Sequence, residues 1–308
     1  MSYKFSILIL MLVLVCAGCK SQPVHTNKGM CEEINSGKPL IFNGTSFEES
    51  VNFINCNPVK FTDEKSHSSV NSPIVFKDCR FNETFIMHSG SGKDVHTCSF
   101  NEKVLFINCT FEKNVDFRSV VFNESVDFQN CQFLSDVTFE ESVFNGKASF
   151  IACYFKGETR FHNTFWADKV SFMDSKFYMI TSFQGSFFNN EAQFSNTEFQ
   201  KYADFSNMSF NSAMFLNYAT FSVKCDFSRS QFKGRFDINN THIGTGDFSN
   251  SYFYGITRFN NLLINENLDL SNSFFIIKPS FDKTFINKIN ITNTKVVGAV
   301  NLELKSDE

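Results

Sequence analysis

The chain has 308 residues, of which 42 are Phe, against 14 Gly, 5 Pro and a single Trp. Hydrophobic residues make up 42% and charged residues 19%, which excludes both a disordered acidic chain and a membrane-embedded bundle. Lys plus Arg number 28 against 32 Asp plus Glu, a net charge of −4, so the chain lacks the basic footprint of a nucleic-acid-binding protein.

The N-terminal segment has the organisation of a secretory signal. One positive charge precedes a short apolar run, residues 5–15, which is too short to span a bilayer. An Ala-Gly pair directly before Cys19 resembles a bacterial lipobox. The resemblance implies that residues 1–18 are a lipoprotein signal peptide and that Cys19 carries the lipid, so we expect a lipid-anchored protein of the bacterial cell envelope. Lys20 favours the outer membrane over the inner one, and an ordinary signal peptide or an uncleaved anchor is the alternative.

Between this segment and the regular part of the chain, the pattern is weak. Residues 19–41 show no clear phase and are predicted to form a tether and an N-terminal cap. Residues 42–99 carry Phe in partial phase with the repeat that follows, so they predict irregular first coils. Polar stretches at 62–73 and 87–97 are predicted to be loop insertions in these coils.

The body of the chain is a repeat of eleven residues, paired into twenty-two. From Phe106 to Phe210, aromatic residues recur at steps that alternate between five and six. Neither the 3.6-residue period of a helix nor the two-residue period of a simple strand produces these steps, so the pattern indicates a solenoid. The residue two before each aromatic is small or β-branched, and both should point inward from an extended segment. Cys109, Cys131 and Cys153 are spaced by 22, which supports a coil of that length.

The unit begins with a small residue, continues with a second residue that is often Asp, and then has Phe. Examples are Val-Asp-Phe at 126–128, Ala-Asp-Phe at 203–205 and Cys-Asp-Phe at 225–227. This resembles the pentapeptide-repeat family, in its Phe-centred form with alternating five- and six-residue spacing. The resemblance implies an all-β fold, a right-handed quadrilateral β-helix, over residues 100–304, followed by a tail at 305–308. About 22 residues per coil are expected here, where the family usually has 20.

Most cysteines fit the small inward position. Apart from Cys16, Cys19 and Cys31, every Cys lies two residues before a central position, so we expect buried free thiols that fill space as Val or Ala would. Cys31 with Cys56 is the expected exception, a disulfide in an oxidising envelope.

One outward column of the predicted rod carries apolar residues. The residue just before each central one should face solvent, and a row of exposed apolar side chains favours a contact surface. It predicts a docking face for a protein partner, a second copy or the membrane surface, unless residues 20–40 fold over it. The candidate contact stripe consists of Val121, Val143, Phe165, Phe187, Tyr252 and Phe274.

A neighbouring outward column is acidic, with one Asp per coil at Asp204, Asp226, Asp247 and Asp269. Carboxylates at about 5 Å spacing repel one another, so a bound cation or a basic partner is one interpretation. The other is structural, because the resemblance to the pentapeptide-repeat family makes Asp a common residue at this position without any chemistry.

Two further groups of polar residues have mainly structural interpretations. Asn123, Asn145, Asn189 and Asn211 follow one Phe column and are predicted to be corner residues that make side-chain hydrogen bonds. His88, Asp94 and His96 fall within a predicted loop, where a solvated loop is favoured over a metal site.

No nucleophile elbow, phosphate-binding loop, dinucleotide fingerprint or zinc signature occurs in the chain. We therefore expect no catalytic residue, no metal and no cofactor. The predicted function is that of a non-catalytic, lipid-anchored envelope protein whose rigid β-helix is a binding or scaffolding surface. Its expected contacts are the membrane, through the N-terminal lipid, and a protein partner or a second copy, with no nucleic acid. The alternatives are a β-helix enzyme acting on polysaccharide, with carboxylates such as Asp204 and Asp226 as acid and base, and a DNA mimic that binds a topoisomerase.

Overall fold

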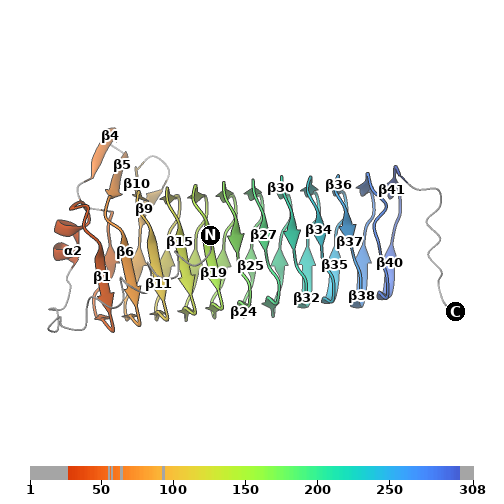
Figure 1. Cartoon of the computed structure of the whole chain (residues 1–308), viewed down its shortest axis with the longest axis horizontal. Coiled ribbons are helices and arrows are strands. Elements are labelled where there is room, and N and C mark those ends of the chain that lie inside the picture. The colour runs from red at the N-terminus through yellow and green to blue at the C-terminus, as the bar shows by residue number, and fades with distance from the viewer. Residues whose placement is uncertain (1–26, 55, 57, 63–64, 92–93, 299–308) are drawn as a thin grey trace, which may run out of the picture.

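A computed structural model describes residues 27–54, 56, 58–62, 65–91 and 94–298. The alternating five- and six-residue steps wind the chain into a straight stack of parallel coils, which runs from α2 (Asn27–Glu33) to the last coil (Figure 1). The register confirms 22 residues per regular coil, because Val104 pairs with Val126 and Val126 with Ala148. The all-β solenoid predicted from the sequence is therefore confirmed.

Each regular coil contributes one short strand to each of four rows, numbered here in chain order. The first row contains β1 (Leu40–Asn43), β6 (Ile74–Lys77), β11 (Val104–Ile107), β15 (Val126–Gln129), β19 (Ala148–Ile151), β23 (Val170–Ser171), β27 (Ala192–Gln193), β31 (Met214–Phe215), β34 (Phe236–Asp237) and β37 (Thr257–Arg258). The second row contains β2 (Ser46–Phe47), β7 (Arg80–Phe81), β12 (Thr110–Phe111), β16 (Gln132–Phe133), β20 (Tyr154–Phe155), β24 (Lys176–Phe177) and β28 (Glu198–Phe199).

The third row contains β3 (Val51–Asn52), β8 (Phe85–Ile86), β13 (Val115–Asp116), β17 (Val137–Thr138), β21 (Thr159–Arg160), β25 (Thr181–Ser182) and β29 (Ala203–Asp204). The second and third rows then merge in the longer strands β32 (Thr220–Asp226), β35 (His242–Asp247), β38 (Leu263–Asp269) and β40 (Phe285–Asn290). The fourth row contains β5 (Lys65–Val70), β10 (Asp94–Phe100), β14 (Val121–Phe122), β18 (Val143–Phe144), β22 (Phe165–Trp166), β26 (Phe187–Phe188), β30 (Ser209–Phe210), β33 (Gln231–Phe232), β36 (Tyr252–Phe253), β39 (Phe274–Phe275) and β41 (Lys295–Val296).

The interior is a set of stacked aromatic columns. In a strand, residues i and i−2 share a face, so the small residue and the Phe of each unit both point inward. The rings of Phe106 and Phe128 stack with centroids 4.5 Å apart and planes 3° apart, and the same contact recurs from coil to coil. Trp166 lies in one of these columns, stacked on Phe144 at 3.9 Å, and its Nε1–H donates to Thr164 Oγ1 at 2.7 Å.

The corner within each five-residue step, between one central residue and the next, contains a residue in the left-handed conformation. From Asn108 to Asn293, positive φ angles of 53–71° recur every ten or eleven residues, so two of the four corners of a coil have this conformation. Asn and Asp tolerate it best after Gly, because their short side chains bond locally. They hold most of the positions: Asp78, Asn108, Asn130, Asn163, Asp174, Asn196, Asn207, Asn240, Asn250, Asn261, Asn272 and Asn293.

The small residue that follows a left-handed corner forms hydrogen bonds as well as filling space. Ser175 Oγ donates to the carbonyl of Phe150 at 2.5 Å and accepts the N–H of Cys153 at 2.8 Å, both from the coil before. Cys153 Sγ occupies the equivalent place one coil earlier, 3.3 Å from the carbonyl of Phe128. These thiols fill space as predicted, at a corner position that Val120 and Ala219 hold in other coils, and the S–H also donates a hydrogen bond.

The predicted state of the cysteines is confirmed for the described residues. Six are buried and free: Cys79, Cys98, Cys109, Cys131, Cys153 and Cys225. A hydrogen bond to Cys131 and burial raise the pKa of the Cys109 thiol to about 12, so it stays protonated at neutral pH.

Helix α2 lies against the N-terminal end of the stack (Figure 1). Met30 and Ile34 are buried there and belong to the hydrophobic core. The predicted pairing of Cys31 with Cys56 is confirmed, with their Cα atoms 5.0 Å apart, and it joins the helix to the chain after β3. The helix therefore closes this end of the core.

The two segments predicted to be loop insertions form hairpins instead. β5 pairs antiparallel with β4 (Val59–Thr62), and β10 pairs antiparallel with β9 (His88–Ser91). β5 and β10 then pair in parallel, so the hairpins stack on each other where they extend from the fourth row (Figure 1). The strand structure was not predicted, because Ser- and His-rich strands lack the alternating apolar signal.

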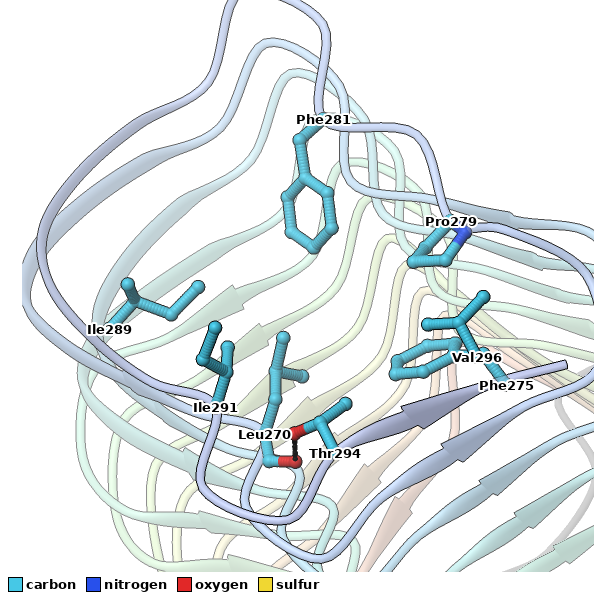
Figure 2. A pocket seen from close by; sticks show the side chains of 8 residues that line it. All are labelled: Leu270, Phe275, Pro279, Phe281, Ile289, Ile291, Thr294 and Val296. Carbon is cyan, nitrogen blue, oxygen red and sulfur yellow. Dashed lines mark hydrogen bonds between the residues drawn. The ribbon is translucent and has the colours of Figure 1, made fainter. Parts of the chain in front are cut away.

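The C-terminal coils are less regular than the coils in the middle of the rod. The step between equivalent residues is 21 from Phe232 to Phe253 and 22 from Phe253 to Phe275, and the register shifts within β32, β35 and β38. Figure 2 shows the apolar opening at the last coil, lined by Leu270, Phe275, Pro279, Phe281, Ile289, Ile291, Thr294 and Val296. Among the described residues, no element covers this end as α2 covers the other.

Candidate functional site

The predicted contact stripe follows the outward positions of the fourth row. Val121, Val143, Phe165 and Phe187 are in register on consecutive strands, and we call these four residues the mid-rod stripe. Phe165 is 39% exposed, and its ring stacks on that of Phe187 with centroids 5.4 Å apart. A ring pair is thus held on the surface by the same strand spacing that stacks the core.

The stripe does not continue unbroken to Tyr252 and Phe274. Ser209 and Gln231 occupy the same column between the two groups. Beyond them Tyr252 is 46% exposed, and its ring lies 6.1 Å from Phe274 and 6.4 Å from Tyr254. The residues of the predicted stripe therefore form two separate apolar surfaces and not one.

The second surface is larger than the sequence prediction. We call it the C-terminal patch, and it comprises Tyr252, Tyr254, Ile256, Phe274, Ile276, Ile277 and Val297. All are exposed except Phe274, which is half-buried. Five were missed because only the position before each central residue was considered. The position after it holds Asn, Ala or Lys in earlier coils and changes to Tyr254, Ile276 and Val297, which was a readable signal.

The acidic column has a structural role in the corners. Oδ1 of each Asp accepts the backbone N–H two residues later, at 2.9 Å for Asp204, 2.9 Å for Asp226, 3.1 Å for Asp247 and 2.8 Å for Asp269. Such bonds fix an Asx turn. Lys224 Nζ lies 3.2 Å from both Asp226 and Asp247, which neutralises the centre of the column.

These bonds also favour the ionised form of the Asp226 carboxyl. Burial works against the ionised form of Asp226, but hydrogen bonds from Ser228 and the ammonium group of Lys224 outweigh it and lower the pKa of this carboxyl. A general acid needs a raised pKa, so Asp226 is poorly suited to that role. No group of acidic, His or Cys side chains among the described residues is arranged to hold a metal ion.

A polar hollow of about 370 Å³ lies on the third row, on the N-terminal side of the acidic column, between Asn114 and His162. Its charged groups have partners: Arg118 pairs with Asp116, His162 with Glu140 at 2.6 Å, and Arg160 with Glu158. These pairs are partly exposed, and side chains already engaged with one another offer little to a substrate.

The Asn corner residues behave as predicted. Asn145 Nδ2 donates to Asn123 Oδ1 at 2.9 Å, and Asn211 Nδ2 donates to Asn189 Oδ1 at 3.1 Å. Asn123 in turn donates to Asn101 at 2.7 Å, so the amides link successive coils along one edge of the rod.

The histidines of the hairpins do not gather around a metal. His88 is in register with Thr97, next to His96 on the same strand pair, so His88 and His96 project from opposite faces of the sheet. His96 Nδ1 contacts Ser66 Oγ. The side chain of Asp94, the third residue of that hypothesis, lies outside the described residues.

The predicted lipidation residue, Cys19, and the signal peptide at 1–18 also lie outside the described residues. Among the residues that are described, no helix has the length and hydropathy needed to cross a bilayer.

Four-stranded coils stacked in parallel around Phe columns, with apolar side chains on parts of the outer surface, define a β-solenoid built from pentapeptide units. Residues 97–143 match the family described as pentapeptide repeats (9 copies), so this part of the chain is built from the repeats of that family. No curated protein matches the chain. A search of solved structures returns QnrB1, described as a plasmid-mediated fluoroquinolone resistance protein, at 15% identity and a TM-score of 0.16, covering 85% of this chain and 91% of that one. A likeness this weak says nothing about function.

Proposed function

We propose that this chain is a non-catalytic, lipid-anchored protein of the bacterial cell envelope, held at the outer membrane, whose rod is a rigid binding or scaffolding surface for a protein partner or a second copy. The mid-rod stripe is the observation that carries the proposal. Outward apolar side chains, of which Phe165 is exposed and the other three are half-buried, lie in register on four consecutive strands and form a flat surface of fixed geometry. Such surfaces mark contact sites.

The rigidity of this surface favours binding. Phe165 and Phe187 are stacked, and their neighbours in sequence, Trp166 and Phe188, are buried in the core. Because the backbone is held by the core, the rings lose little conformational freedom when a partner covers them, and aromatic side chains with this property are frequent centres of protein interfaces.

The lipid anchor and the membrane location are tested by fatty-acid labelling. We expect a fatty-acid probe to label the wild type in the membrane fraction and not to label Cys19→Ser. A label that survives the substitution, or an unlabelled protein in the cytosolic fraction, would contradict the anchor.

The binding surface is tested separately. We expect crosslinking in intact envelopes to give one defined adduct, to a partner identified by mass spectrometry or to a second copy, and Phe165→Ser with Phe187→Ser to abolish it. Gln231→Ser, on the same column outside the stripe, is the matched control. The same adduct in the double variant would overturn the assignment of the stripe.

The DNA-mimic alternative receives little physical support from the acidic column. Duplex DNA carries one negative charge per roughly 1.7 Å of axis, whereas one Asp per coil gives one per about 4.8 Å. Lys224 reduces this further. We expect no effect of the protein on supercoiling by gyrase, and clear inhibition would favour that alternative.

A further inference from the structure

The C-terminal patch combines aromatic, aliphatic and basic side chains in a way that the mid-rod stripe does not. Its columns run over consecutive coils: Tyr252 and Phe274 are in register, and Lys295 follows them in the same column. Tyr254, Ile276 and Val297 occupy the adjacent column, on the corner toward the first row. At about 4.8 Å per strand, the patch extends roughly 10 Å along the rod.

Among the residues that the structure describes, lysines surround this patch and carboxylates do not. Lys233 precedes Tyr254 in its column, Lys278 follows Ile277, and Lys295 ends the column of Tyr252. All three are exposed, and the ion pairs of the described residues include neither Lys278 nor Lys295.

The acidic side chains of the same coils face elsewhere. Asp282 is exposed at the corner between the first and second rows, beside Asn260. Asp247, Glu266 and Asp269 lie on β35 and β38, which belong to the merged second and third rows. Asp237 is 1% exposed and is paired with both Arg235 and Arg258. The charge presented beside the patch is therefore positive.

We propose that the C-terminal patch docks on the surface of an anionic lipid bilayer. Tyr and aliphatic side chains settle at the boundary between headgroups and acyl chains, where an amphipathic ring finds both an apolar and a polar environment. Lysines at the margin extend to the phosphates, and each one adds attraction to an anionic leaflet. A flat surface of short strands suits a flat bilayer, and the positive margin selects anionic lipid over a neutral surface.

This inference goes beyond the proposed function and does not depend on it. Cys16 and Cys19 are replaced by Ser in every protein used, so no acyl chain contributes, and the mid-rod stripe is left intact. The remaining free thiols that the structure describes are buried, so an introduced cysteine can be labelled selectively.

The test places an environment-sensitive nitrobenzoxadiazole label at Ile276→Cys, in the patch. The matched control carries it at Gln132→Cys, which is exposed on the opposite, second row. Both full-length proteins are mixed with vesicles of phosphatidylcholine and phosphatidylglycerol that contain a lipid with a quencher near the headgroup. We expect quenching at position 276 and not at 132, and weak or no quenching on pure phosphatidylcholine.

The basic margin is tested with Lys278→Gln and Lys295→Gln together, which should raise the vesicle concentration needed for half-maximal quenching roughly tenfold or more. Equal quenching at 276 and 132, no quenching at either, or unchanged binding of the lysine variant would overturn the proposal. A label at 276 that is already shielded without vesicles, in a protein of dimeric mass by light scattering, would assign the patch to a second copy instead.

Discussion

The two ends of the rod differ in how the last apolar layer is completed. At the N-terminal end, α2 contributes Met30 and the turn after it contributes Ile34, both buried, and a disulfide fixes the helix to the first coils. At the C-terminal end, Phe281, Ile286 and Ile289 are only partly buried. A parallel stack leaves one apolar layer and one set of strand edges without a neighbour at each end. The comparison teaches that stability in such a fold depends on position along the stack and not only on residue type.

The largest contrast should come from the aromatic columns. Phe172 is fully buried between Phe150 and Phe194, with centroids 4.9 Å away on each side, whereas Phe281 stacks on Phe259 at 4.9 Å and is half-buried. We expect Phe172→Ala to cost about 3–5 kcal/mol of unfolding free energy, and Phe281→Ala about 1–2 kcal/mol. Denaturant unfolding followed by circular dichroism measures both, and equal costs would show that position in the stack does not matter.

Removal of the disulfide should have the second-largest effect, which is a loss of stability at the N-terminal end. Cys31→Ser with Cys56→Ser should lower the unfolding free energy by about 2–4 kcal/mol, because the crosslink restricts the unfolded chain. Hydrogen exchange should show the loss in the first coils before the regular ones. Exchange that rises uniformly along the rod would mean that the helix stabilises the whole stack cooperatively.

The corner hydroxyls give a smaller contrast of the same kind. Ser175→Ala leaves the buried N–H of Cys153 without its acceptor and should cost about 1–3 kcal/mol. Ser175→Cys, the residue used in neighbouring coils, should be nearly neutral. At the end of the rod Thr294, whose Oγ1 donates to Leu270 at 2.7 Å, is half-buried, so Thr294→Ala should cost less than Ser175→Ala in thermal melting.

Backbone strain should not follow this gradient. Tyr218 (φ 61°) and Lys283 (φ 53°) hold left-handed corners with side chains that disfavour them, one in the middle and one near the end. We expect Tyr218→Asn and Lys283→Asn to stabilise the protein by about 0.5–1 kcal/mol each, since the backbone relief is the same at both sites. Tyr218→Phe is the control and should leave the melting temperature unchanged.

The smallest effect concerns acid. A lowered pKa for Asp226 in the folded state contributes stability above the unfolded value of about 3.9, and this stability is lost as the pH falls through the folded value. The melting temperature of the wild type should therefore fall as the pH is lowered below about 4, and that of Asp226→Asn should fall less. An identical acid limb in both proteins would show that the bonds to Ser228 and Lys224 do not stabilise the fold.

The sequence predicted the winding because the apolar pattern alone determines it. Steps of five and six place each Phe over the one 22 residues before, and no other regular structure satisfies that spacing. The hairpins at 59–70 and 88–100 could not be predicted in the same way, because their pairing depends on polar strands whose partners are distant in sequence.

The candidate sites were predicted unevenly for a similar reason. Phe165 and Phe187 followed from counting one position per unit, but the C-terminal patch needed the neighbouring positions as well. The corner role of Ser175 and of four cysteines depends on the left-handed φ of the residue before each, which sequence periodicity does not reveal; these cysteines are Cys79, Cys109, Cys131 and Cys153.

The number of coils and their spacing set the distance between the two apolar surfaces. The mid-rod stripe ends at Phe187 and the C-terminal patch begins at Tyr252, with Ser209 and Gln231 marking the strands between them. Each coil contacts only its neighbours, so inserting or deleting one 22-residue unit would change the separation by a single increment of about 4.8 Å. The straight stack would keep both surfaces on the same side of the rod, so their distance can evolve in steps without remaking either surface.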